Sequence, residues 1–172
     1  MQKTFLLGFM CVVMSSSAVA DEQAKWQQER QLRIETANQM DLSIPKQLCS
    51  RSGDIVTNKD VALFKQVFVA TPATDKQVEG HLSKLYKKYF VTDYRGINDF
   101  RLVEGEHFGF VDAKNSSNDS VKDSASRRDY DTVVWIRYEF DTQNTKTDHI
   151  IAKGGRCEVA KFDNQWRVIK LL

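Results

Sequence analysis

Residues 132–140 read Thr132-Val133-Val134-Trp135-Ile136-Arg137-Tyr138-Glu139-Phe140, a run in which large apolar side chains recur at every second position. Successive side chains of a β-strand point to opposite faces. One face of this strand would carry four large apolar side chains, those of Val134, Ile136, Tyr138 and Phe140. The other face would carry a mixed set, Val133, Trp135, Arg137 and Glu139. The segment therefore predicts a strand whose uniformly apolar face packs on the core.

The same two-residue period appears on both sides of this strand. Upstream, it is carried by Phe100, Leu102, Phe108 and Phe110. Downstream, a third strand is expected over residues 149–162, and a turn at 163–165 leads to a last strand over 166–171. Gly154 and Gly155 lie inside the third strand, where paired glycines usually mark a bulge or bend. We therefore expect a curved antiparallel sheet of about four strands.

The residues before the sheet favour helices. Residues 22–40 are good helix formers with a ragged apolar stripe, which predicts a peripheral helix. Ile44-Pro45 and residues 49–53 predict a connection, because the residue before a proline avoids the helical region. Residues 57–60 resemble a helix start, and a short helix should follow to about residue 69.

The strongest helical pattern spans residues 75–90. Thr74 and Gln77 have the spacing of a capping box. Behind them, apolar side chains recur at helical spacing at Val78, Leu82, Leu85, Tyr86, Tyr89 and Phe90. The other face carries Lys76, Lys84, Lys87 and Lys88. Such lysines are typical of a solvated helix exterior, with a binding patch as the alternative. Helices followed by antiparallel strands define the α+β class, here with N-terminal helices packed on the sheet.

Residues 112–131 separate the first two strands and are dominated by Ser, Asn, Asp and Lys. A connection of about twenty residues is long for a compact domain. We expect a mobile polar loop, with an interaction element as the alternative. Arg127 and Arg128 lie near its end and are candidates for contacting a partner.

Residues 1–20 have the three zones of a secretory signal peptide. Lys3 supplies a positive charge, residues 5–14 are mainly apolar, and Ala18-Val19-Ala20 has the A-x-A form of a cleavage site. Cleavage after Ala20 would leave residues 21–172 as a single exported α+β domain, most simply in a bacterial periplasm. An uncleaved anchor is the alternative, although the apolar run is shorter than the ~20 residues that span a bilayer. No later segment is predicted to span a membrane.

Cys49 and Cys157 are the cysteines that remain after cleavage. An even number of cysteines in an oxidising compartment favours a disulfide between them. Two separate buried thiols are the alternative. The histidines lack metal-ligand spacing, so neither a metal nor another cofactor is predicted.

The ending, residues 157–169, reads Cys-Glu-Val-Ala-Lys-Phe-Asp-Asn-Gln-Trp-Arg-Val-Ile. This turn, followed by Trp166 and alternating apolar residues, resembles the last hairpin of the nuclear transport factor 2-like superfamily. The order of elements is similar as well. The resemblance implies a curved sheet that closes a cone over helices. It also implies either an enzyme that uses an Asp, His or Tyr inside the cone or a non-catalytic binding protein.

His107 is the catalytic candidate in this sequence. Gly105 and Gly109 flank it and could leave room for a ligand. A general base needs its partner within hydrogen-bond reach, which spacing alone does not supply. An ordinary polar strand residue is the alternative, and whether the protein is an enzyme stays open, with the balance against it.

Trp135 and Arg137 share the mixed face of their strand, and both residue types are enriched where proteins bind one another. We predict that they contact a partner protein together with Arg127 and Arg128; the alternative is that a helix or the N-terminal segment covers Trp135. The formal net charge of +2 argues against a general nucleic-acid binder. The leading hypothesis is a non-enzymatic exported protein that binds or inhibits another protein, such as a toxin-neutralising immunity-type protein. The alternatives are a small-molecule binder or hydrolase/isomerase with a cone-shaped pocket, and a structural component of an envelope assembly. A homodimer is a further candidate partnership.

Overall fold

The computed structural model describes residues 15–172, with side chains described from residue 19 onward. Most of the predicted signal peptide therefore lies outside the described residues. The chain divides into two compact units, residues 1–32 and 33–172. Within the described range, no helix combines the length and the apolar character needed to cross a bilayer.

Helix α1 (Ser15–Asn38) begins in the first unit and ends in the second. The helix predicted over residues 22–40 is therefore present and starts earlier, so the predicted cleavage site after Ala20 falls within it. In the first unit its large apolar side chains Val19, Trp26 and Leu32 are exposed.

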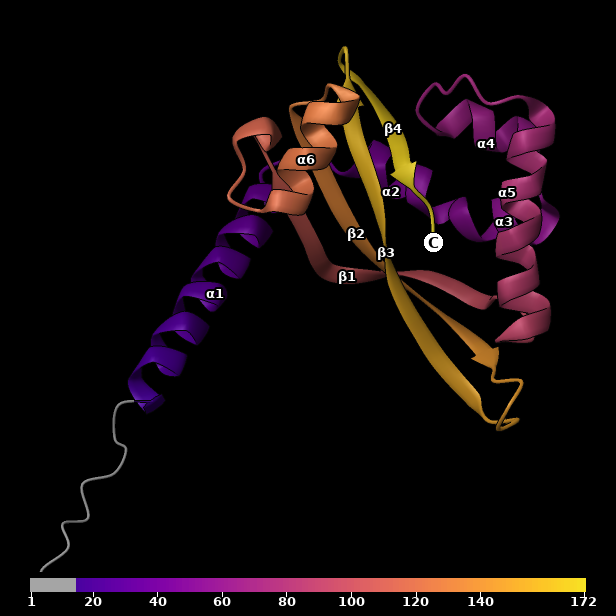
Figure 1. Cartoon of the computed structure of the whole chain (residues 1–172), viewed down its shortest axis with the longest axis horizontal. Coiled ribbons are helices and arrows are strands. Elements are labelled where there is room, and N and C mark those ends of the chain that lie inside the picture. Colours follow the sequence, from indigo (N-terminus) through magenta and orange to yellow (C-terminus); the bar gives the residue numbers. More distant parts are fainter. Residues whose placement is uncertain (1–14) are drawn as a thin grey trace, which may run out of the picture. The chain divides into compact units, whose positions relative to one another are not determined.

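The second unit is built on a four-stranded antiparallel sheet, which confirms the predicted fold class. Its strands are β1 (Asn98–Phe110), β2 (Thr132–Gln143), β3 (Ile150–Phe162) and β4 (Gln165–Lys170), and their spatial order equals their order in the chain. The long strands bend strongly along their length (Figure 1). Each connection joins neighbouring strands, so the sheet is a simple meander.

Both faces of the sheet carry a core. The apolar face of β2 supplies Val134, Ile136, Tyr138 and Phe140 to the larger cluster. The helices on that side add Cys49, Ile55, Val56, Phe64, Val67, Val78 and Leu82. Val133, on the opposite face of β2, is fully buried in a second cluster. The mixed face of β2 is therefore not simply a solvent face.

Helices α2 (Ser43–Ser50), α3 (Ser52–Asn58), α4 (Val61–Val67) and α5 (Asp75–Lys87) cover the larger cluster. Helix α2 packs against all four strands, and α3 and α4 pack against α5. Thr74 and Gln77 form the predicted capping box at the start of α5. At α4 the cap is Asp60, whose carboxylate accepts a hydrogen bond from the Leu63 amide at 2.8 Å.

The connection predicted over residues 49–53 is wrong, because α2 runs through Ser50 and α3 starts at Ser52. Pro45 lies in the first turn of α2, where the missing amide proton would have no intrahelical partner in any case. Cys49 is completely buried on this helix. Burial of an apolar face against the sheet outweighs the weak local preference for a turn.

Of the bulge or bend predicted at Gly154 and Gly155, the bulge is absent from the pairing with β2. The pairing of β2 with β3 runs without a register shift from Thr132↔Lys161 to Gln143↔Ile150. Gly155 pairs with Tyr138, and a Cβ atom at Gly155 would overlap the Tyr138 hydroxyl. The glycine is needed for that close approach. Register shifts lie instead in the pairing of β1 with β2, between Asn98 and His107, where Gly105 has a φ of +72°, and in the pairing of β3 with β4, between Glu158 and Val159.

Residues 112–131 are mostly ordered structure, which corrects the prediction of a mobile loop. They contain a short 3₁₀ turn (Ala113–Asn115) and helix α6 (Asp119–Arg128). Asn118 caps α6 by accepting a hydrogen bond from the Val121 amide at 3.1 Å. Val121 and Ala125 lie four residues apart and are buried in the second cluster with Val133. Helix α6 thus covers the face of the sheet opposite α3–α5 (Figure 1).

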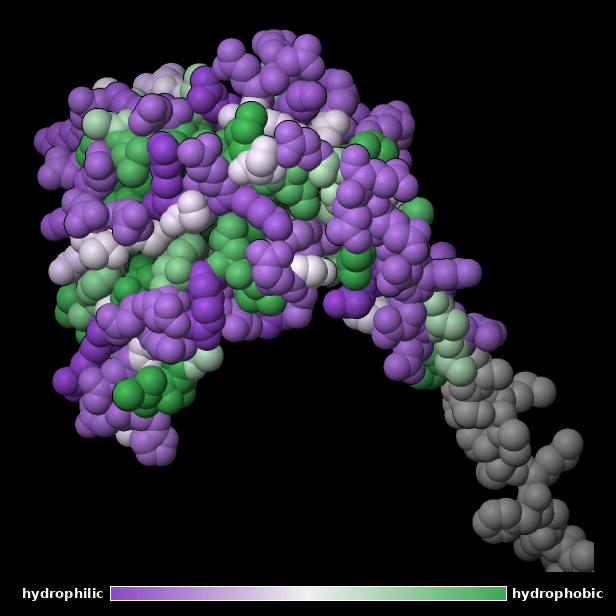
Figure 2. Space-filling model, turned by 180° about the vertical axis from the view of Figure 1, so that it is seen from behind, coloured by the Kyte–Doolittle hydropathy of each residue, from purple (hydrophilic) through white to green (hydrophobic). Residues whose placement is uncertain are grey.

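Exposed apolar side chains are scattered over the surface. On the face shown in Figure 2, green patches are separated by polar side chains and do not merge into one continuous area. In the second unit the large apolar residues left exposed are Ile44, Val91, Val111 and Ile150. A partner would therefore meet small apolar patches set among charges.

Candidate functional site

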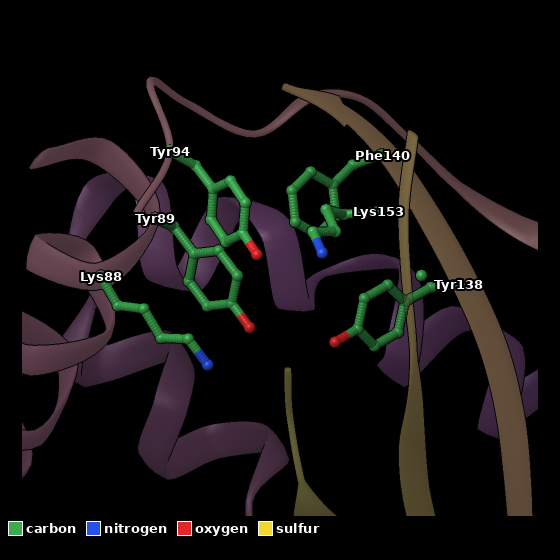
Figure 3. Close-up of a pocket in the computed structure, with 7 residues that line it drawn as sticks. Lys88, Tyr89, Tyr94, Tyr138, Phe140 and Lys153 are labelled. Carbon is green, nitrogen blue, oxygen red and sulfur yellow. The ribbon is translucent and has the colours of Figure 1, made fainter. Parts of the chain in front are cut away.

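A pocket of about 150 Å³ opens where the end of α5 faces the β2–β3 hairpin. Its lining consists of Lys88, Tyr89, Tyr94, Tyr138, Phe140, Lys153 and Gly154. Figure 3 shows the tyrosine hydroxyls and both lysine side chains directed toward a common space. The lining is thus aromatic and cationic, with no imidazole, carboxylate or thiol among these seven residues.

A π-helical turn, η1 (Lys88–Thr92), places the first two lining residues. It follows α5 directly and is closed by the Asp93 amide, which donates to the carbonyl of Lys88 at 3.1 Å. Insertions of π-helix are rare and frequently occur at functional sites. The wider turn brings Lys88 and Tyr89 to the pocket together.

The segment after η1 is tied to the β2–β3 hairpin by backbone bonds. The Arg95 amide donates to the carbonyl of Gln143 at 2.9 Å, and the Thr145 amide donates to that of Asp93 at 3.2 Å. Tyr94 forms an isolated bridge with Asn144. These bonds hold the α5 side of the pocket against its sheet side.

The sheet side follows from strand alternation. Tyr138 and Phe140 are two residues apart on β2 and therefore share the inner face. Lys153 pairs with Phe140 across the ladder, so its side chain emerges on that same face. The register of β2 against β3 thus sets one lysine beside two aromatic rings.

The aromatic rings form the walls of the pocket. Tyr89 meets Phe140 edge to face at 5.6 Å between centroids and stacks on Tyr94 at 6.0 Å. Tyr138 lies 6.3 Å from Phe140 and 5.2 Å from Phe100. Such pairs add to the burial energy of each ring and hold the side chains in place.

The two ammonium groups rest on these rings. Lys88 Nζ lies 5.1 Å from the centroid of Tyr89, and Lys153 Nζ lies 5.2 Å from that of Tyr94. Within residues 19–172, neither lysine has an acidic side chain within 4.0 Å. The pocket therefore carries two positive charges that the described part of the chain does not neutralise directly.

Tyr138 remains a neutral phenol in this setting. Burial raises the pKa of its hydroxyl well above the usual value, and the neighbouring Tyr89 hydroxyl raises it further. A protonated hydroxyl can donate a hydrogen bond to a bound group. Tyr138 is therefore suited to holding a ligand.

Cys49 and Cys157, predicted to pair, lie at disulfide distance, with Sγ atoms 2.03 Å and Cα atoms 5.8 Å apart. Both side chains are fully buried. They join α2 to β3 within the larger cluster, and neither of them lines the pocket.

Trp135 and Arg137 share a face of β2, as the sequence predicted, but their groups are largely engaged within the molecule. The Arg156 guanidinium lies 3.6 Å from the centroid of the Trp135 ring, whose other neighbour is Phe110 at 4.7 Å. Trp135 is therefore half-buried, and the group that lies over its ring is an arginine of β3.

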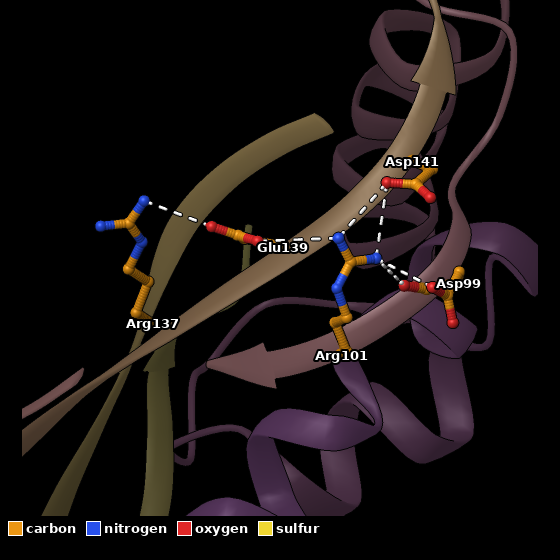
Figure 4. A network of polar contacts seen from close by, with 5 residues as sticks. All are labelled: Asp99, Arg101, Arg137, Glu139 and Asp141. Atoms are coloured by element: carbon orange, nitrogen blue, oxygen red, sulfur yellow. Dashed lines mark hydrogen bonds and ion pairs between the residues drawn. The ribbon is translucent and has the colours of Figure 1, made fainter. Parts of the chain in front are cut away.

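Arg137 belongs to a network of charges along β1 and β2 (Figure 4). It pairs with Glu106 at 2.7 Å and with Glu139 at 3.3 Å. Arg101 continues the network toward Glu139, Asp99 and Asp141. These groups neutralise one another, which leaves Arg137 less free to bind a partner's carboxylate.

Arg127 and Arg128 end helix α6 and are bound locally. Arg128 donates to the carbonyl of Ile169 at 2.9 Å, and Arg127 donates to that of Asp123 at 3.2 Å. These bonds fasten α6 to β4 and close its last turn. The predicted protein-binding residues thus lie on one side of the sheet without forming one cationic cluster.

His107 is buried on β1, with 4% of its surface exposed, and neither ring nitrogen has a hydrogen-bond partner among the described residues. Burial lowers the pKa of its imidazole, and Lys46 on α2 lowers it further. Lys46 itself pairs with Glu104 at 3.4 Å. His107 does not line the pocket, so the structure does not join it to the aromatic and cationic groups found there.

His107 should make the protein less stable in mild acid. Because its folded-state pKa lies below the usual 6.5, neutral His107 favours folding above pH 6.5, and this contribution is lost as the pH falls below that value. His107→Leu removes two unsatisfied polar atoms and should raise the free energy of unfolding by about 1 kcal/mol at pH 7. Urea denaturation between pH 8 and pH 5 measures both effects. Parallel pH profiles for the two proteins would contradict the assignment.

Comparisons with known proteins do not assign this chain to a family. No protein-family model, no curated protein and no solved structure matches the chain. The resemblance to the nuclear transport factor 2-like superfamily therefore stays a prediction. Among residues 15–172, no group of three His, Cys, Asp or Glu side chains could hold a metal ion.

The sequence did not identify the pocket residues as a site. It assigned Lys88 to a solvated helix exterior and Tyr89, Tyr138 and Phe140 to apolar core faces. The one available signal was the run Lys87-Lys88-Tyr89-Phe90, where the basic face and the apolar face of the helix meet at its end. Lys153 and Tyr94 carried no local signal.

Proposed function

We propose that this chain is an exported, non-enzymatic protein that binds another protein through the pocket end of its sheet. The signal-peptide layout of residues 1–20 supports export. The Cys49–Cys157 pair supports an oxidising compartment such as a bacterial periplasm, because disulfides persist there. A toxin-neutralising, immunity-type role is one inhibitory function that fits this description.

The observation that carries the proposal is the size and opening of the pocket. Its volume of about 150 Å³ is small. Sites that enclose a whole drug-sized molecule usually measure roughly 300–1,000 Å³. A pocket of this size suits a single side chain that a larger partner inserts.

The surroundings of the pocket support a protein partner. Val91 belongs to η1, which also supplies Lys88, and its side chain is 60% exposed. Ile150 begins β3, which supplies Lys153, and it is 80% exposed. Tyrosines beside exposed apolar groups are common at protein interfaces. The lining also lacks His, Asp and Glu, the commonest general bases, which favours binding over the hydrolase or isomerase alternative.

Site-specific photo-crosslinking in the native compartment tests this function. A photoreactive residue at Val91 or Ile150 should give one discrete adduct with another protein. The control position is Asn164, an exposed residue of the β3–β4 turn at the opposite end of β3. The recovered chain should begin at Asp21. Equal adducts at all three positions, or none at 91 and 150, would reject the interface, and a retained Met1 in the cytosol would reject export.

A further inference from the structure

We infer that the pocket takes a carboxylate group on a short aliphatic stem, presented by the partner as an acidic side chain or a free C-terminus. This inference rests on the proposed function and adds the chemistry of the recognised group. It follows from the charges, the hydrogen-bond donors and the dimensions of the lining.

The charge of the pocket favours an anion. Lys88 and Lys153 approach from opposite sides, one from η1 and one from β3, and both point into the same space (Figure 3). The contrast with Lys114 is direct, because Asp129 at 2.7 Å and Asp131 at 3.2 Å already neutralise that lysine. Lys88 and Lys153 have no such carboxylate among the described residues, so an anion that enters the pocket would be attracted to both.

The tyrosines define where the anion would sit. The hydroxyls of Tyr89, Tyr94 and Tyr138 point toward the space between the lysines (Figure 3). The Tyr138 hydroxyl is a protonated phenol that shares a hydrogen bond with Tyr89, and burial raises its pKa. To bind an anion, it would turn this donor toward an oxygen of the ligand. The tyrosine rings and Phe140 offer apolar walls for the methylene groups that carry a carboxylate.

The lining favours a carboxylate over a phosphate. No arginine lines the pocket, so neither anion would find a bidentate guanidinium there, and the choice between them depends on their charge. The nearest helix, α5, presents its C-terminal end, which carries partial negative charge and disfavours a dianion. A single negative charge is repelled by that helix end less strongly than a double charge, and the two lysines together outweigh it.

Peptide binding to protein purified from the periplasm tests the inference. The probes are acetyl-Ala-Glu-Ala-amide, its Gln counterpart, acetyl-Ala-Ala with a free C-terminus, and inorganic phosphate. Amide chemical-shift changes at Lys88, Tyr94 and Lys153 report occupancy. We expect at least one carboxylate probe to bind about tenfold more tightly than the neutral Gln peptide. Binding of the Glu peptide would indicate that the partner presents an acidic side chain, and binding of acetyl-Ala-Ala would indicate that it presents a free C-terminus.

Variants assign the binding to the pocket. Lys88→Gln and Lys153→Gln should each weaken carboxylate binding about fivefold, since each removes one of the two positive charges that line the pocket. Lys84→Gln is the matched control, because Lys84 is exposed on α5 and does not line the pocket. Thermal melts should show the same fold for all three variants.

Two results would overturn the carboxylate assignment. One is equal binding of the Glu and Gln peptides together with no binding of the free C-terminus, and the other is phosphate binding more tightly than both carboxylate probes. A discrete adduct at Val91 combined with either result would leave the proposed protein partnership standing. Carboxylate binding without any adduct at Val91 or Ile150 would reject the proposed protein interface and leave the carboxylate assignment standing.

Discussion

Replacing Cys49 and Cys157 with alanine is expected to lower the free energy of unfolding by about 4–5 kcal/mol. The disulfide closes a loop of 108 residues, and in the chain-entropy model a loop of about that length restricts the unfolded state by this amount. The bridge also holds α2, which packs against all four strands, to the centre of β3. Urea denaturation of the double variant measures the loss.

Reduced wild-type protein is the control for this substitution. It keeps both buried sulfur atoms but lacks the link, so its unfolding midpoint should fall nearly as far as that of the double variant. If the reduced and oxidised proteins unfold at the same urea concentration, the link contributes no stability. If only the double variant is weakened, the loss comes from packing around the two completely buried side chains.

The sheet was predictable because its signal is local. In β2 the inner side chains alternate with the outer ones, and the structure buries every one of the four residues assigned to the core face. The capping box at Thr74 was equally local, since the Thr74 and Gln77 side chains each accept a hydrogen bond from the backbone amide of the other residue. Elements that are determined by interactions among a few neighbouring residues can be predicted from the sequence.

Helix α6 was missed because composition concealed its buried face. Ser, Asp and Lys dominate the segment, while only Val121 and Ala125 are buried within the helix. Two buried residues at i and i+4 suffice here, because the rest of the second cluster comes from outside the helix: Phe110, Ala113, Tyr130, Val133, Ala160 and Ile169. The cap at Asn118 was the signal that could have placed the start of α6.

The pocket could not be derived from the sequence, because three separate segments build it. Lys88 and Tyr94 come from η1 and the turn that follows it, Tyr138 comes from β2, and Lys153 comes from β3, about sixty residues after Tyr94. Only the tertiary pairing of that turn with the β2–β3 hairpin brings them together. From the sequence alone, where this pairing is not visible, Lys88 looks like any exposed lysine on the polar face of a helix.

Gly155 links the sheet to the pocket, and Gly155→Ala should lower the free energy of unfolding by about 3 kcal/mol, the upper part of the range for overpacked sites. The new Cβ would overlap the Tyr138 hydroxyl and lie 2.5 Å from Cζ of that ring. Tyr138 is 3% exposed and is flanked by Phe100 and Phe140, so it has little room to turn away. Because Tyr138 also lines the pocket, the variant should lose carboxylate binding as well.

Gly154→Ala separates this clash from the general effect of adding a methyl group to β3. At Gly154 the nearest atom to a Cβ would be the Tyr138 carbonyl oxygen at 3.3 Å, a tight contact that a small shift relieves. That variant should change the free energy of unfolding by less than about 1 kcal/mol. Combining Gly155→Ala with Tyr138→Ala should then destabilise less than the sum of the two single changes, because the second removes the ring that the first displaces. Strict additivity, or equal losses at positions 154 and 155, would show that the space over Gly155 is not what fixes Tyr138 in the pocket.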